Sequence, residues 1–341
     1  MTSRMKFLKS AGAIVISAAA GASLTITAFA QTPAGGAATT TPPPAGGRAA
    51  LPPPPPIDAL IKGAHWHDIT INTTDPAKAI AFYTRQFKAK PATWNGQPAV
   101  WAQKSWLLFN KVKKPASTAF NTAIWHIGWG APDPKAAYAR QISLGASFAQ
   151  PITDISTGLR GFRPDQFYYM YVATPEHTMV ELNTAATDNF DHIHMFSLDP
   201  VAAGDWYMKT FGVRGRLSTP QTNREPTYSI SVEHIQVGPS SSINFDNVNM
   251  IIYPVEYATK SYAKDWTNVK EMQTTRGKAF DHIGVSVPDI DLALRLLRGQ
   301  GTKIVSGVHK VNDKLKVAWI EGPDHIAIEL LQDETDHPPL E

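Results

Sequence analysis

One pattern occurs four times in the chain and constrains the fold more than any other feature. Each copy begins with a short apolar strand, continues to an Asp and then enters an amphipathic helix. The copies begin at His67, Ile124, Phe190 and Phe280. Internal repetition of this kind predicts a protein built from similar structural units, here four modules, and not one irregular domain.

The Asp of each copy predicts the start of a helix. An Asp side chain can accept hydrogen bonds from the first backbone N–H groups of a helix. In three copies a Pro follows at once, and the first helical position tolerates its missing N–H. The apolar spacing beyond it, as at Ile290, Leu294 and Leu297, is close to 3.6 residues. We therefore interpret these residues as helix caps and not as metal ligands: Asp75, Asp133, Asp199 and Asp289.

A His precedes the Asp by seven residues in three of the four copies, at His126, His192 and His282. The first copy has Asp68 in that position, with His67 one residue earlier. Imidazole is the commonest metal ligand in proteins. The repeat therefore predicts a metal site assembled from equivalent strands, against the alternative that these side chains only pack in a cup without metal.

The N-terminal part predicts export. Residues 1–30 combine a basic start, an apolar stretch and an Ala28-Phe29-Ala30 cleavage site, as a signal peptide does. An uncleaved membrane anchor is the alternative. Residues 31–60 are rich in Pro, Ala, Gly and Thr and predict a disordered linker. We expect a periplasmic or secreted protein with no membrane span after cleavage, and without Cys it can form no disulfide.

The charge balance argues against nucleic acid as a partner. The chain has 32 Lys and Arg against 29 Asp and Glu, and three of the basic residues lie in the predicted signal peptide. The mature protein would be close to neutral and would lack the basic surface that binds nucleic acid or anionic lipid. We therefore expect a small molecule as its substrate or ligand.

The ends of the copies repeat as well. The segments Tyr171–Asn183 and Trp319–Gln332 share a strand, a Pro-acid-His turn, a second strand and a Glu-Leu pair. Copies one and three lack this Glu and have Asn110 and Tyr253 in its place. The order of the copies is thus A-B-A-B, which predicts two tandem domains of two modules each, over residues 61–188 and 189–335.

The helices of copies one and three also share an aromatic-Tyr-x-x-x-Phe sequence. Together with the strand-helix-three-strand module and the Glu-Leu ending, it resembles the vicinal oxygen chelate (VOC) superfamily. That superfamily holds glyoxalase I, bleomycin-resistance proteins and type I extradiol dioxygenases. The resemblance covers roughly residues 63–333. It implies an α+β fold of four βαβββ modules paired into two tandem VOC domains, whose sheets curl into open cups with metal ligands on the first and last strands.

The resemblance implies a metal site in the second domain, with His192, His282 and Glu329 as ligands. Two imidazoles and one carboxylate with open coordination positions suit Fe(II), and Mn, Zn or Ni are also possible. His194 faces the same side of its strand as His192, because strand side chains alternate. We take His194 and Tyr253 as candidate catalytic residues, the latter leaving room for substrate.

The matching positions of the first domain are Asp68, His126 and Glu181, with Asn110 in the fourth. This set can also bind a divalent metal, although the resembling extradiol enzymes often keep metal only in their second domain. One inserted residue would bring His67 into register instead and turn Asp68 away. The sequence leaves both arrangements open.

Two functions follow from these observations. The first is an exported, divalent-metal-dependent enzyme that acts on a small vicinal-oxygen substrate in its second domain, by dioxygenase-like or glyoxalase/lyase-like chemistry. The alternative is a metal-free, small-molecule-binding protein of the bleomycin-resistance type, which sequesters its ligand. An abundance of Trp in the first domain favours the alternative: Trp66, Trp94, Trp101, Trp106, Trp125 and Trp129.

Overall fold

The computed structural model describes residues 58–102, 105–118, 121–158, 163–215, 228–230, 235–237, 240–256 and 271–334. The predicted signal peptide and almost all of the predicted linker lie outside these ranges. The described residues belong to one compact unit, Leu51–Glu341. Among them, no helix is long and apolar enough to span a bilayer.

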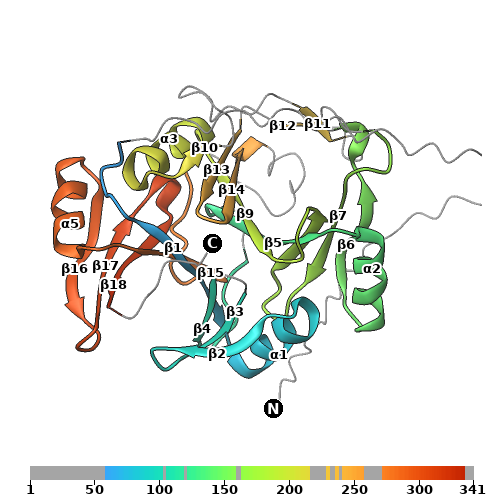
Figure 1. Cartoon of the computed structure of the whole chain (residues 1–341), viewed down its shortest axis with the longest axis horizontal. Helices are drawn as coiled ribbons and strands as arrows, with labels where there is room; N and C mark the ends of the chain where they lie inside the picture. The colour runs from blue at the N-terminus through green and yellow to red at the C-terminus, as the bar shows by residue number, and fades with distance from the viewer. Residues whose placement is uncertain are drawn as a thin grey trace, which may run out of the picture. The chain divides into compact units, whose positions relative to one another are not determined.

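The first of two eight-stranded sheets combines modules one and four (Figure 1). At its centre the first strands of the two modules, β1 and β15, pair antiparallel. The strand order is β16 (Lys303–Lys310), β17 (Leu315–Glu321), β18 (Ala327–Asp333), β15 (Phe280–Ser286), β1 (His65–Thr73), β4 (Trp106–Lys111), β3 (Gln97–Trp101) and β2 (Lys90–Trp94).

The second sheet combines modules two and three in the same manner, with β5 and β9 antiparallel at its centre. Its order is β10 (Arg214–Gly215), β13 (Ser241–Phe245), β14 (Val248–Pro254), β9 (Phe190–Ser197), β5 (Ile124–Ala131), β8 (Met179–Thr184), β7 (Tyr168–Ala173) and β6 (Phe148–Asp154). A separate two-stranded pair is formed by β11 (Tyr228–Ile230) and β12 (Ile235–Val237).

These pairings confirm the fold class and correct the predicted partners of the modules. Module one does not share a sheet with module two, nor module three with module four; each predicted segment, 61–188 and 189–335, contributes to both sheets. The connections explain the difference. Only residues 185–189 separate β8 from β9, whereas residues 255–279 separate β14 from β15. Because short connections favour spatial neighbours, module two pairs with module three.

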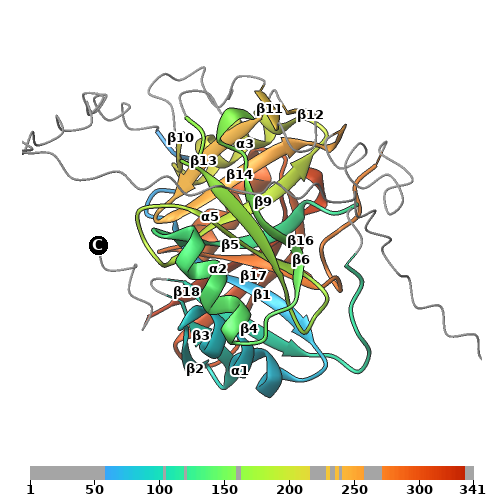
Figure 2. The same cartoon turned by 90° about the vertical axis from the view of Figure 1, so that its right-hand side faces the viewer.

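Within the described residues, four helices cover the outer faces of the sheets: α1 (Pro76–Phe87), α2 (Pro134–Ser143), α3 (Pro200–Phe211) and α5 (Ile290–Gly299). Each helix begins directly after the predicted Asp. The side chain of that Asp accepts a hydrogen bond from the backbone N–H three residues later, which confirms the interpretation as caps. Helices α1 and α2 lie side by side (Figure 2), where Arg140 Nη1 donates to the Gln86 carbonyl at 2.5 Å. Two short 3-10 helices are η1 (Ser156–Gly158) and η2 (Pro323–His325).

The two faces of each sheet have different roles. The main core lies between sheets and helices and includes Ile69, Tyr83 and Trp129. The opposite, concave faces form the predicted cups. The cup of the first sheet contains an apolar cluster: Leu315, Val317 and Leu331, with Trp94 packed against it. The cup of the second sheet contains a mainly aromatic cluster: Trp125, Ile155, Tyr169, Tyr171, Phe196, Tyr253, Val255 and Met272.

Candidate metal centre

A β-bulge lies immediately before the expected ligand position in each of the four first strands. The register skips one residue on each strand, and the skipped residues are His67, Trp125, Asp191 and Asp281. A bulge adds a residue to one strand and changes the direction of nearby side chains. The open question about the first module is thereby answered: Asp68 pairs with Gly284 in the ligand position, and His67 is the extra residue.

The bulged residues contact the ligand-position residues that follow them. The Asp191 carboxylate lies 2.5 Å from Nδ1 of His192, and the Asp281 carboxylate lies 2.7 Å from Nδ1 of His282. A carboxylate on one ring nitrogen orients the imidazole and leaves the other nitrogen, Nε2, for a ligand or metal. The bulges therefore supply supporting groups as well as geometry.

Four donor side chains converge in the cup of the second sheet. They are His126 from β5, Glu181 from β8, and His192 and His194 from β9. All four are buried, and one ligand atom of each lies within 4.8 Å of the others. Oε2 of Glu181 is central, at 2.7 Å from Nε2 of His126, 3.6 Å from Nε2 of His194 and 3.8 Å from Nε2 of His192.

Gly128 provides the space for this arrangement. It lies on β5 opposite Glu181 on one side and His192 on the other. A Cβ atom at this position would lie 1.8 Å from Nε2 of His192, so no larger residue fits while the ring stays in place. Nε2 of His192 is itself buried and has no hydrogen-bond partner among the described residues. Because an unpartnered imidazole nitrogen beside a carboxylate is a good donor set, this group could hold a divalent metal ion.

The charges of the group also suit a cation. Burial alone would raise the pKa of Glu181, but His194, His126 and His192 outweigh it and hold that pKa well below its ordinary value. Burial lowers the pKa of His194 well below its ordinary value and also lowers the pKa of His126. The centre thus presents an ionised carboxylate and two neutral imidazoles, which is the protonation state that metal ligands require.

His192 differs from the other two imidazoles. Burial would lower its pKa, but the hydrogen bond to Asp191 and the nearby charge of the Glu181 carboxylate outweigh this effect and raise the pKa to about 10. The imidazolium is therefore held between two carboxylates when no cation is bound. A metal ion at Nε2 would replace that proton, so binding would release it.

Both residues predicted to be catalytic adjoin the centre. The His194 ring stacks on the His126 ring, with centroids 4.5 Å apart, and lies 5.2 Å from the Tyr253 ring. The Trp125 ring is 4.2 Å from the His126 ring and stacks on Phe196. His194 thus lies between the carboxylate of the centre and an aromatic wall.

The cup of the first sheet has a related but different donor set. Nε2 of His282 is 3.7 Å from Oε2 of Glu329. A Cβ on Gly284 would lie 1.8 Å from Oδ2 of Asp68, so Gly284 repeats the role of Gly128. Thr70 is paired with His282 and donates to Oδ1 of Asp68 at 2.9 Å. This cup therefore has two carboxylates and one ligand-position imidazole, with Asp68 already hydrogen-bonded inside it.

The pKa of His282 reflects these neighbours. Burial would lower it, but Asp281, Glu329 and Asp68 outweigh burial and raise it to about 9. The two cups therefore differ: the cup of the second sheet has two neutral imidazoles, His126 and His194, beside a carboxylate, whereas the pKa of the one ligand-position imidazole of the first sheet is raised.

The chain matches a known family over its C-terminal half. Residues 189–330 match the model of the Glyoxalase/Bleomycin resistance protein/Dioxygenase superfamily, and the two modules that precede this match, β1 to β8, have the same order of strands and helix. Residues 189–330 therefore belong to this superfamily. No curated protein sequence matches it.

Solved structures support the same fold for the whole described part of the chain. Glyoxalase I from Zea mays is 12% identical, with a TM-score of 0.57 over 79% of this chain and 92% of the maize chain. A variant of the maize enzyme is 13% identical, with a TM-score of 0.58 over the same shares. At such identities the likeness shows the fold of paired modules and not the reaction.

The structure places the predicted metal ligands of the chain in two different sheets. His192 lies in the second sheet, whereas His282 and Glu329 lie in the first, so the three do not form one site. Likewise Asp68 lies in the first sheet, away from the His126 and Glu181 of the second. Each predicted residue lies on the strand expected for it, but the residues of each predicted set lie in different sheets because the modules pair differently.

Three contributions to the centre were not foreseen from the sequence. His194 was expected to be catalytic, yet its Nε2 lies among the donors. The supporting carboxylate of Asp191 and the space at Gly128 were missed. The repeated Asp-His pairs at 191–192 and 281–282 were a sequence signal for the supporting carboxylate of Asp191.

Proposed function

We propose that the chain is an exported, divalent-metal-dependent enzyme whose metal is held by His126, Glu181 and His192. The convergence of these buried donors around one carboxylate oxygen carries the proposal. Two imidazoles and one carboxylate on a rigid sheet, with positions left open, suit Fe(II) best among the common metals. Mn, Zn and Ni are the other candidates for this donor set.

The substrate that fits this centre is a small molecule with two neighbouring oxygen atoms. When bound, the metal would polarise these oxygens as a Lewis acid or provide a place for O₂ to react. The chain's own groups would do the rest. Trp125, Phe196 and Tyr253 form an aromatic wall that orients a planar substrate and excludes water.

His194 is the acid–base candidate beside the metal ligands. Its imidazole is neutral, because burial lowers its pKa, so it can accept a proton from a substrate hydroxyl. The sequence predicted Tyr253 in the position of the missing Glu, but the register of β14 with β9 places Ile251 there, opposite His194, as Glu181 lies opposite Gly128 and Glu329 opposite Gly284. That replacement leaves the metal with two imidazoles and one carboxylate and favours dioxygenase-like over glyoxalase-like chemistry.

Metal analysis with matched variants tests the proposal. Protein purified anaerobically should contain about one metal ion in this centre, which Glu181→Gln loses and Glu329→Gln, the matched change in the other cup, retains. Fe or Mn with O₂ consumption on catechols would support a dioxygenase, and Zn or Ni would support an isomerase or lyase. Failure to bind any of these ions after reconstitution would overturn the enzyme.

The second candidate function is metal-free sequestration of a small molecule. The aromatic cluster of the second cup favours it, because such surfaces bind planar ligands without metal. It would be supported by tight ligand binding that is unchanged in Glu181→Gln and by the absence of bound metal.

Export belongs to the same proposal and rests on residues 1–30. Cell fractionation of the full-length chain should find it outside the cytoplasm, and deletion of residues 1–30 should retain it inside. Equal distribution of the two forms would contradict export.

A further inference from the structure

A cavity of about 740 Å³ adjoins the metal centre at the rim of the second cup. Two of its lining residues, Trp125 and Met179, also belong to the aromatic cluster of that cup or pack against it. Trp125 contacts the His126 ring at 4.2 Å between centroids. A molecule in the cavity would therefore lie one ring away from the metal ligands.

The lining of the cavity is amphipathic. One part is apolar and includes Ile124, Trp125 and Phe280; another carries hydroxyls, including those of Thr122 and Thr178. The basic side chains of Lys278 and His177 line it, and none of its described lining residues is acidic. Such a lining suits a ligand with an apolar body and an anionic group.

The charge of Lys278 is available for a ligand. Its Nζ donates to Oε1 of Gln273, a neutral acceptor, at 2.8 Å. Within the described part of the chain, Lys278 forms no ion pair, and neither do Lys111, Lys113 and Lys114.

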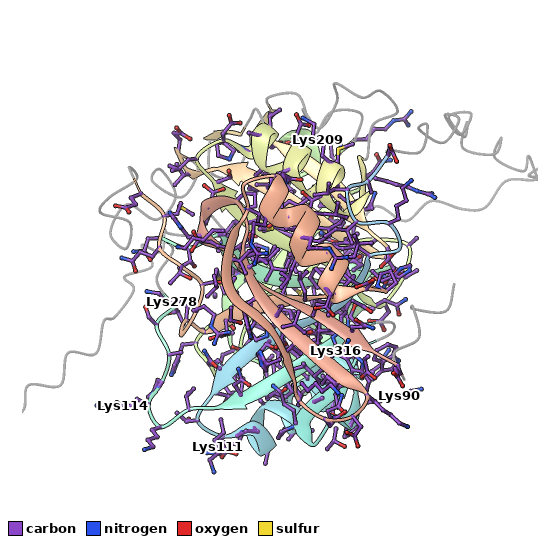
Figure 3. The ribbon with its side chains drawn as sticks, turned by 90° about the vertical axis from the view of Figure 1, so that its left-hand side faces the viewer. Lys90, Lys111, Lys114, Lys209, Lys278 and Lys316 are labelled. Atoms are coloured by element: carbon purple, nitrogen blue, oxygen red, sulfur yellow. The ribbon has the colours of Figure 1, made fainter. Side chains whose placement is uncertain are left out.

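Further lysines lead towards the cavity. Lys111, Lys113 and Lys114 come just before residues 116–118, which form part of its wall. Ser117 in that wall makes a β-bridge with Lys278. Figure 3 shows Lys278, Lys114 and Lys111 one after another along one edge of the molecule. The nearby carboxylate of Asp281 is already engaged by His282, Asn72 and the Gly277 N–H. Positive charge thus predominates at the cavity.

We propose that this cavity binds the part of the substrate that lies away from the metal, and that this part is a carboxylate or sulfonate on an apolar body. The inference deepens the proposed enzyme by naming its substrate as an organic anion. It rests on the proposed function only for the claim that the other end of the substrate binds the metal. Binding at the cavity needs no metal and can be measured in metal-free protein.

Two fluorescent probes that differ in charge test the proposal. The anion 1-anilinonaphthalene-8-sulfonate and its neutral counterpart N-phenyl-1-naphthylamine share the same aromatic body. We expect Lys278→Gln to weaken binding of the anion about fivefold, the size of one partly exposed charge interaction. Binding of the neutral probe should change less than about twofold, since only charge is removed. Lys209 is exposed on α3 and distant from Lys278 in Figure 3, so Lys209→Gln is the matched control and should change neither.

A second variant locates the probes. Ala149 is exposed and lines the cavity, so Ala149→Trp should occupy part of it and weaken binding of both probes without changing the unfolding temperature. Undiminished binding in Ala149→Trp, equal weakening of both probes by Lys278→Gln, or no binding to the folded protein would each overturn the proposal.

The same titration in Glu181→Gln separates this proposal from the proposed enzyme. Loss of metal with unchanged probe binding would support independent subsites. If the wild-type protein binds the probe but takes up no metal, the proposed enzyme function would be refuted and the assignment of the cavity would stand.

Discussion

Replacing Gly128 by Ala should remove metal from the second cup while leaving the fold intact. The new Cβ would lie 1.8 Å from Nε2 and 2.0 Å from Cε1 of His192. Ordinary contact distances would then require the ring to move by roughly 1.5 Å. Coordination distances tolerate only about 0.2 Å, so His192 would cease to be a ligand. We expect a loss of metal affinity of about 100-fold, or about 2.7 kcal/mol.

Co²⁺ is a suitable probe, because its visible spectrum reports both affinity and ligand geometry. Competition with a chelator would give the dissociation constants of wild type and Gly128→Ala. The matched control is Gly284→Ala, whose Cβ would lie 1.8 Å from Oδ2 of Asp68 in the other cup. It imposes a similar steric conflict and should leave the imidazole-rich centre unchanged. Wild-type affinity in Gly128→Ala, or loss of this centre only in Gly284→Ala, would refute the reasoning.

Three further changes test supporting features. Asp191→Asn should weaken metal binding about tenfold by chelator competition, because Asp191 orients His192 at 2.5 Å; unchanged affinity would contradict that role. Burial raises the pKa of Glu176 above its ordinary 4.5, so its contribution to stability is present at low pH and lost as pH rises through the folded-state pKa. Glu176→Gln should therefore match wild type in denaturant unfolding at pH 4 and exceed it by about 1 kcal/mol at pH 8; a pH-independent difference would argue otherwise. Asp289→Ala removes the cap that accepts the Leu292 N–H at 2.8 Å and should lower the unfolding free energy by about 1 kcal/mol, and an unchanged denaturation midpoint would count against the cap.

The sequence predicted the modules because each one carries its own local signals. The cap at Asp199 and the Pro after it determine where α3 begins, whichever partner the module has. The pairing of modules is a long-range property, and four similar first strands offer several compatible partners. The short connection 185–189 was the signal that favours pairing modules two and three, and the A-B-A-B order obscured it.

The sequence predicted which residues are candidate ligands, but it did not predict which of them lie together in one site. His126, His192 and Glu181 were each identified from their repeat positions, yet they come together only because β5 pairs with β9. The bulge at Asp191 shifts the alternation by one residue, so that Phe190 and Ile193 both enter the core although they are three residues apart. A strict period of two residues does not predict such a shift. Nε2 of His194 lies 3.6 Å from Oε2 of Glu181, which places His194 among the donors. Strand alternation predicts the face on which His194 lies but not its distance from a residue on another strand.

The most direct test of the central claim is anomalous X-ray diffraction from crystals grown anaerobically with Co²⁺. The account predicts a peak in the second cup, about 2.0–2.2 Å from Nε2 of His126, Nε2 of His192 and a carboxylate oxygen of Glu181. Full occupancy beside His282 and Glu329 with none beside His126 would contradict it, as would crystals of the folded protein that take up no metal.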